Sequence, residues 1–217
     1  MVKKAILAII AVLFCGTLFS QQSDDGIIIP DIPKSYNLSI GPKIGLGLVS
    51  GTKTSNNYKF QSGFDLQLGA SSILHFGHRF DSSPSGTGLF GLKMELLYEY
   101  RMPNTDFGTI NMHCVEIPVL WQYYPISSLA SEFAIEAGVT IVKTLKCSPE
   151  QMQLNNIIYH VGQLSSADVM VSLGLSYRTP YKVSFDARYN IGTSPLAGNL
   201  DSKLSTITVS AVYLLDF

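Results

Sequence analysis

Hydrophobic and polar residues alternate along most of this chain. In the stretch 88–101, every even-numbered residue from 90 to 100 is Phe, Leu, Met or Tyr, while all four charged residues occupy odd-numbered positions. A β-strand points successive side chains to opposite faces, whereas a helix repeats every 3.6 residues or so. The pattern therefore predicts a strand with one apolar face and one charged face.

The same alternation recurs in seven further stretches, separated by polar segments that contain Gly, Pro, Asn or Ser. An even number of strands, with longer polar loops at one end and short turns at the other, predicts an all-β fold, an antiparallel up-and-down barrel with both chain ends on one side. Pro118 falls inside one strand and cannot donate a ladder hydrogen bond, so we expect a bulge or bend there. The eight predicted strands are 36–49, 59–76, 88–101, 109–124, 132–145, 166–178, 182–192 and 205–217.

The distribution of charge decides which face points inward. Charged residues share a face with the glycines, and an eight-stranded barrel has room inside only for small or well-packed side chains. We therefore predict that the charges line the lumen and that the apolar face meets lipid, as in a transmembrane barrel. The predicted lumen charge network is Lys43, Asp65, Lys93, Glu95, Glu99, Arg101, Glu116, Glu136, Asp168, Arg178, Asp186 and Arg188.

Aromatic residues on the opposite face gather near the strand ends, which is typical of the girdles that lie at the two membrane interfaces. The predicted aromatic girdle is Tyr98, Tyr100, Trp121, Tyr123, Tyr177, Tyr189 and Tyr213. The last predicted strand ends in Phe217, and it resembles the closing strand of bacterial outer-membrane barrels, in which a final Phe is part of the assembly signal. This resemblance implies the barrel assembly machinery as a partner and the outer membrane of a Gram-negative cell envelope as the location.

The N-terminus has the layout of a cleaved secretory signal peptide: Lys3 and Lys4, an apolar run, then small and polar residues up to Ser20. Beyond it, no apolar run reaches the 18 or so residues of a membrane-spanning helix. We divide the 217 residues into a signal peptide at 1–20, an exposed leader at 21–35 and the barrel at 36–217. Cleavage leaves thirteen basic and sixteen acidic residues, a net charge of −3, and no basic patch for nucleic acid.

Two sequence motifs extend the resemblance to a family. The segments Gly41-Pro42-Lys43-Ile44-Gly45 and Val115-Glu116-Ile117-Pro118-Val119-Leu120, with the signal peptide and Phe217, are similar to the small outer-membrane β-barrels called PorT-like. Some members of that family are linked to a protein secretion and gliding apparatus. The resemblance implies a barrel fold for nearly the whole mature chain, and it leaves the activity open.

We weigh three classes of function. The favoured one is a structural or interaction role, with an accessory role in secretion included. Its partners would be outer-membrane lipid and an envelope or secretion protein, recognised through loops at 50–58, 146–165 and 193–202. The alternative is a narrow polar pore for small solutes, although a salt-bridged plug suits so small an interior better.

An enzyme is the third and least favoured class. Its candidate bases are His75, His78, His113 and His160, whose spacing forms no recognised catalytic or metal-binding motif. We therefore expect no catalytic residue, no metal and no cofactor. Cys114 and Cys147 lie on neighbouring predicted strands near the same end of the barrel. The sequence is compatible with a disulfide between them and with two separate thiols.

Overall fold

The computed structural model describes residues 37–51, 60–76, 89–105, 108–127, 132–149, 151–154, 157–160, 168–193 and 203–216. These residues form strands and turns, and within them no helix is long and apolar enough to cross a membrane. The predicted signal peptide, the leader and Phe217 lie outside the described residues, as do His78 and most of the segments between strands.

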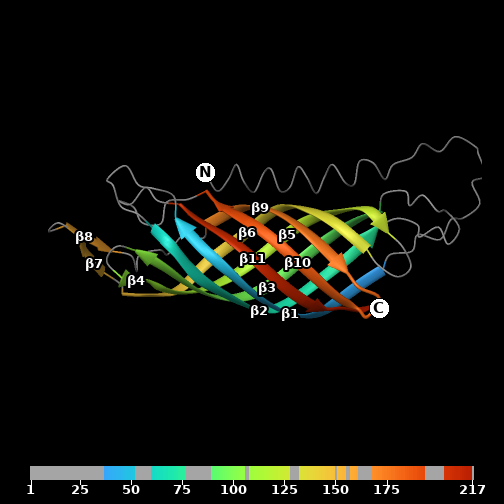
Figure 1. Cartoon of the computed structure of the whole chain (residues 1–217), viewed down its shortest axis with the longest axis horizontal. Helices are drawn as coiled ribbons and strands as arrows, with labels where there is room; N and C mark the ends of the chain where they lie inside the picture. The colour runs from blue at the N-terminus through green and yellow to red at the C-terminus, as the bar shows by residue number, and fades with distance from the viewer. Residues whose placement is uncertain are drawn as a thin grey trace, which may run out of the picture. The chain divides into compact units, whose positions relative to one another are not determined.

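Eight long strands form one antiparallel sheet that closes on itself (Figure 1). Neighbours in sequence pair with one another around the sheet, and β1 pairs with β11 to close it. The prediction of an eight-stranded up-and-down barrel is thus confirmed. The strands are β1 (Asn37–Gly51), β2 (Phe60–Phe76), β3 (Leu89–Thr105), β5 (Asn111–Ser127), β6 (Glu132–Ser148), β9 (Asp168–Arg178), β10 (Val183–Gly192) and β11 (Leu204–Tyr213).

Four short strands extend the two ends of the barrel. At one end, β4 (Gly108–Thr109) pairs with β3, and β7 (Gln151–Leu154) pairs with β8 (Ile157–His160) as a separate hairpin. At the other end, β12 (Leu215–Asp216) pairs with the start of β1. We call these the loop end and the terminal end. The loop end is external in our assignment, because bacterial barrels carry their longer loops outside the cell and short turns in the periplasm.

The strand register fixes the tilt of the barrel. A row of paired residues that starts at Lys143 on β6 passes through Val115 and Tyr98, circles the sheet, and returns to β6 at Phe133, ten residues away. Such an offset in an eight-stranded barrel requires strands tilted by about 40°. Ten residues at about 3.3 Å each then span roughly 25 Å along the axis, the height of the apolar band of outer-membrane barrels.

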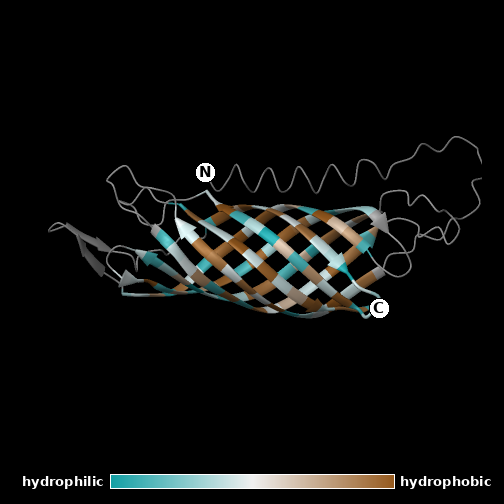
Figure 2. Ribbon diagram, viewed as in Figure 1, coloured by the Kyte–Doolittle hydropathy of each residue, from teal (hydrophilic) through white to brown (hydrophobic). Residues whose placement is uncertain are grey.

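Alternation along each strand separates the two faces (Figure 2). On β1, the even-numbered Ile44, Leu46 and Leu48 are more than half exposed, whereas the odd-numbered Ser39 and Lys43 are buried. The other long strands repeat this arrangement, with apolar side chains outside and most charged side chains inside. The predicted assignment of the two faces is therefore correct.

Three local predictions differ from the structure. The bulge expected at Pro118 is absent, because Pro118 pairs with Thr140 in regular register; on its other side, Glu95 and Leu96 of β3 are missing from the ladder. The bulges of β5 and β6 instead lie between His113 and Cys114 and between Tyr123 and Ile126. The segment 146–165 is not one loop, because β6 continues to Ser148 and β7 and β8 follow. Strand β3 likewise continues past Arg101 to Thr105, because its polar end still pairs with β2 and β4.

Candidate functional site

Six charged side chains from four strands meet in the middle of the lumen. The two ammonium groups and one guanidinium group lie within ion-pair distance of three carboxylates, and all six side chains are at most 3% exposed. The formal charges balance. We call this set, which comprises Lys43, Lys93, Glu95, Glu136, Asp186 and Arg188, the central cluster.

The distances within the central cluster link its members into one network. Lys93 Nζ lies 2.7 Å from Asp186 Oδ2 and 3.0 Å from Glu136 Oε1. Lys43 Nζ donates to Glu95 Oε1 at 2.8 Å, and Arg188 Nη1 donates to the other oxygen of Glu95, also at 2.8 Å. Buried ions need partners of opposite charge, and this arrangement supplies them across the full width of the barrel.

A second group of charges lies nearer the loop end. The Arg101 guanidinium pairs with Glu99 at 2.6 Å and with Glu116, and Gln67 donates to Glu99 at 3.1 Å. Asp65, directly opposite Arg101 in the β2–β3 register, is fully buried as well. Three carboxyl groups therefore surround one cation, so this acidic cluster (Asp65, Glu99, Arg101, Glu116) does not balance in formal charge.

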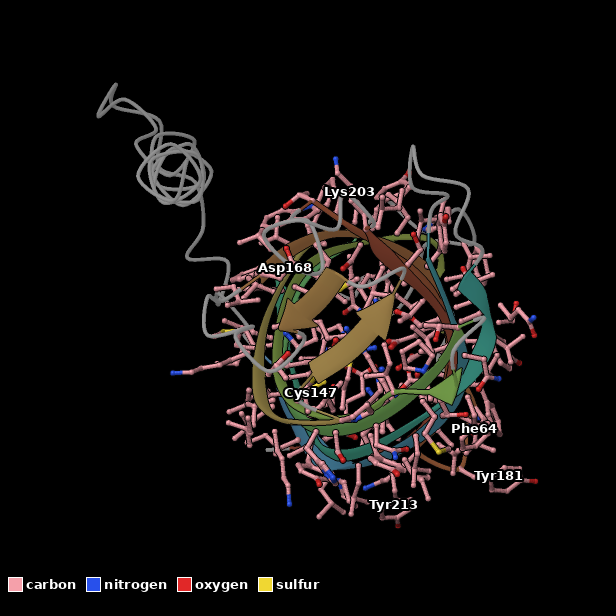
Figure 3. The ribbon with its side chains drawn as sticks, turned by 90° about the vertical axis from the view of Figure 1, so that its left-hand side faces the viewer. Phe64, Cys147, Asp168, Tyr181, Lys203 and Tyr213 are labelled. Carbon is pink, nitrogen blue, oxygen red and sulfur yellow. The ribbon has the colours of Figure 1, made fainter. Side chains whose placement is uncertain are left out.

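Apolar side chains fill the lumen beyond the acidic cluster. This loop-end cluster contains Val49, Ile110, Met112, Cys114, Val142, Cys147, Met170 and Leu204, all buried. Met170 reaches inward far enough for its sulfur to lie 3.8 Å from Arg101 Nη2. Cys114 on β5 and Cys147 on β6 are buried and form no disulfide in the structure. The view along the barrel axis shows the interior occupied by side chains (Figure 3).

A third polar group closes the terminal end. Arg178 Nη2 lies 2.6 Å from Asp216 Oδ1, which also accepts a hydrogen bond of 2.6 Å from Ser39. On the other side, the Tyr124 hydroxyl donates to Gln122 Oε1 at 2.6 Å and lies 3.1 Å from His75 Nε2. The last short strand, β12, is thus joined by side chains to β1 and β9.

The aromatic residues predicted to form girdles point away from the lumen. Tyr98, Trp121, Tyr123, Tyr177, Tyr189 and Tyr213 are between 40% and 48% exposed, and Tyr100 is half-buried. Tyr213 and Tyr181 stand outside the ribbon in the axial view (Figure 3). A closed sheet satisfies all of its backbone hydrogen bonds internally, as a structure in lipid must. An apolar outer face with ion pairs in the lumen is the arrangement of a barrel whose outer wall contacts lipid. The fold is that of an eight-stranded transmembrane β-barrel.

No family model and no curated protein matches this sequence. Among solved structures, the chain is similar to the outer-membrane enzyme PagL, with 15% identity, a TM-score of 0.48, and coverage of 78% of this chain and 97% of PagL. It is also similar to Ail, the attachment invasion locus protein of Yersinia pestis, at 16% identity and a TM-score of 0.41, with 82% and 99% covered. The assignment of the barrel rests on its own strand pairing and closure.

The structure brings most of the predicted lumen residues together and separates others. Arg178 lies in the terminal-end group, and Asp168 lies half-buried at the rim where β9 begins (Figure 3). Of the candidate bases, His75 is inside the terminal end and His113 is on the outer face near the loop end, so they form no common site. His160 belongs to β8, and its side chain lies outside the described part of the structure.

Two features escaped sequence reasoning. Gln67 and Gln122 donate hydrogen bonds to the buried Glu99 and Glu136. The only sequence signal for this role was that both glutamines occupy inward positions in the alternation. The apolar loop-end cluster was also missed, because Met112, Val142 and Met170 occupy inward positions at which the pattern predicts polar residues.

Proposed function

We propose that this protein has a structural or interaction role in the outer membrane and recognises a partner through its loop end. The observation that supports this most is the filled lumen. Along the barrel axis the interior holds the apolar loop-end cluster, the acidic cluster, the neutral central cluster and the hydrogen-bonded terminal-end group. An interior packed in this way favours a rigid support over a conduit.

The loop end offers the surface for recognition. Strands β3, β5 and β6 extend furthest there, and the β7–β8 hairpin follows β6 directly (Figure 1). Segments carried on a rigid barrel are the usual place for binding residues, because the scaffold fixes their ends while the segments themselves vary. We propose an envelope or secretion protein as the partner, with the PorT-like resemblance as the reason for including secretion.

Replacing residues 150–166 by a short Gly-Ser linker tests the recognition role. Strands β6 and β9 stay intact in this variant, because it spares Ser148 and Asp168. We expect the altered barrel to keep its heat-modifiable mobility in SDS gels and to lose cross-linking to the partner captured by the wild type. The matched control replaces 194–202, between β10 and β11. Unchanged capture after removal of the β7–β8 hairpin would refute its role in recognition.

A narrow polar pore is the alternative, and one feature favours it. The acidic cluster carries more carboxyl groups than cations, which is the kind of lining that cation pathways use. Planar-bilayer recordings separate the two functions. The filled lumen predicts no steady single-channel conductance, whereas stable openings that Glu99→Gln abolishes would establish the pore.

We do not propose an enzymatic role. Within the described residues, no three His, Cys, Asp or Glu side chains are grouped so that they could hold a metal ion. His75 and His113 lie on opposite sides of the barrel wall, and each lies within hydrogen-bond distance of a different tyrosine hydroxyl, so they form no common site.

A further inference from the structure

Three basic side chains interrupt the uncharged outer wall of the barrel. Among the described residues of the eight long strands, the outward-facing positions that carry a positive charge, or can acquire one, are His113, Lys143 and Lys146. Both lysines are exposed and His113 is half-buried. The three are neighbours: His113 on β5 pairs directly with Lys146 on β6, and Lys143 pairs with Val115, two residues along from His113. We call them the basic patch.

The register places the basic patch at the outer edge of the apolar band. Lys143 and Phe133 lie on the same strand, roughly 25 Å apart along the barrel axis by the offset derived above. The apolar band of such barrels is about 25 Å tall. If Phe133, at the start of β6, lies at the lower edge of this band, then Lys143 lies at the upper edge. His113 and Lys146 lie one step nearer the loop end, at the level of the lipid headgroups.

Tyrosines of the upper girdle hold the histidine in place. The Tyr98 hydroxyl lies 2.5 Å from His113 Nδ1, and the ring of Tyr100 lies 4.9 Å from the imidazole, centroid to centroid. When the hydroxyl donates to Nδ1, the imidazole proton resides on Nε2, which can then donate to an acceptor outside the protein. Tyr100 is fixed in turn by a hydrogen bond of 3.0 Å to Asn111.

Within the part of the chain that the structure describes, no ion pair balances the charges of the basic patch. Neither lysine forms an ion pair with another described residue, whereas the cations of the lumen are matched to carboxylates. Ammonium groups at a membrane surface are favoured where the lipid headgroups are anionic. Two lysines and a histidine donor on adjacent strands offer three donor groups to a phosphate group, which accepts several hydrogen bonds at once.

We propose that the basic patch binds a phosphate group of a phosphorylated glycolipid in the outer leaflet. Lys143 and Lys146 would supply the charge, His113 a directional hydrogen bond, and exposed Leu145 contact with the acyl chains. The site lies on the wall of the barrel, so it is independent of partner recognition by the loops.

The experiment compares lipid binding to barrel variants in detergent by native mass spectrometry. The probes are bisphosphorylated lipid A and the same lipid after enzymatic dephosphorylation. We expect the wild type to bind the phosphorylated form more tightly. Lys143→Gln with Lys146→Gln should weaken that binding by roughly twenty-fivefold, about fivefold for each lysine, and leave binding of the dephosphorylated form unchanged.

Two further variants keep the result interpretable. Lys182→Gln, in the exposed turn at the terminal end, removes a lysine far from the basic patch and should leave lipid binding as in the wild type. Lys143→Arg with Lys146→Arg keeps the charge and should retain phosphate-dependent binding. The proposal is overturned if the wild type does not discriminate the two lipids, if the double glutamine variant binds like the wild type, or if Lys182→Gln weakens binding equally.

Discussion

Replacing Lys93 by methionine removes a buried cation while keeping nearly the same side-chain length. Lys93 is fully buried, and its ammonium group lies within 3.4 Å of oxygens of Asp186, Glu136 and Glu95. Removing one partner of a buried ion pair costs about 3–5 kcal/mol, because the remaining charge has lost its compensation. Asp186 keeps Lys43 at 3.3 Å and Glu136 keeps the Gln122 amide at 2.7 Å. We therefore expect Lys93→Met to lower the free energy of unfolding by about 3 kcal/mol, the lower limit of that range.

The assay is equilibrium unfolding of the barrel in lipid vesicles by guanidinium chloride, followed by the fluorescence of the single tryptophan, Trp121. A second variant, Lys93→Met with Asp186→Asn, restores the charge balance of the central cluster. Its loss of stability should fall short of the sum of the two single losses by about 1–3 kcal/mol, since the two groups are in direct contact. A cost below about 1 kcal/mol for Lys93→Met, the size expected of a solvated pair, would refute the sealed lumen.

Three further predictions follow from other parts of the barrel. Asp65→Asn should leave the unfolding free energy unchanged or raise it by about 1 kcal/mol, because Arg101 pairs with Glu99 and Glu116 and leaves the buried Asp65 carboxyl group without an ion pair of its own among the described residues. A loss of about 2 kcal/mol in the same unfolding assay would contradict the described acidic cluster. Gly41→Ala should cost about 1–3 kcal/mol in that assay, because a Cβ there would clash with the backbone carbonyl of Tyr213. Gly91→Ala is the milder control, because its nearest contacts are side-chain atoms at 3.2 Å. Arg178→Gln should leave the barrel folded but speed digestion of the C-terminus by carboxypeptidase, because Asp216 loses its ion pair. Digestion at the wild-type rate would contradict this prediction, because the Ser39 hydrogen bond and the pairing with β1 would then hold β12 in place without Arg178.

The fold could be predicted from the sequence because a barrel in lipid imposes a two-residue period on every strand. The alternation in 88–101 assigned Lys93 and Glu95 to the lumen, and the structure has both buried. A one-residue slip would expose these charges to lipid, so the inward face is strongly specified. The strand ends were less predictable, because residues 102–105 and 146–148 lie above the apolar band, where polar and apolar residues are both tolerated.

The detailed pairing inside the lumen depends on the register between strands. Lys93 and Asp186 are far apart in sequence, and nothing in their local pattern indicates that they meet. The basic patch was likewise invisible in the alternation: Lys143 is one outward residue among many until the bulge between His113 and Cys114 aligns His113 with Lys146. Sequence periodicity thus identifies the face of a side chain, and tertiary register identifies its partner.

Fluorescence of Trp121 tests the placement of the outer face in lipid most directly. Trp121 is the only tryptophan, it points outward at 45% exposure, and it packs against the Phe76 and Phe90 rings. In vesicles of phospholipids brominated on their acyl chains, we expect strong quenching of the folded barrel's emission, with little quenching by iodide in the water. Emission that iodide quenches and brominated lipid leaves unchanged would contradict the lipid-facing assignment and would place the apolar wall of the barrel in water.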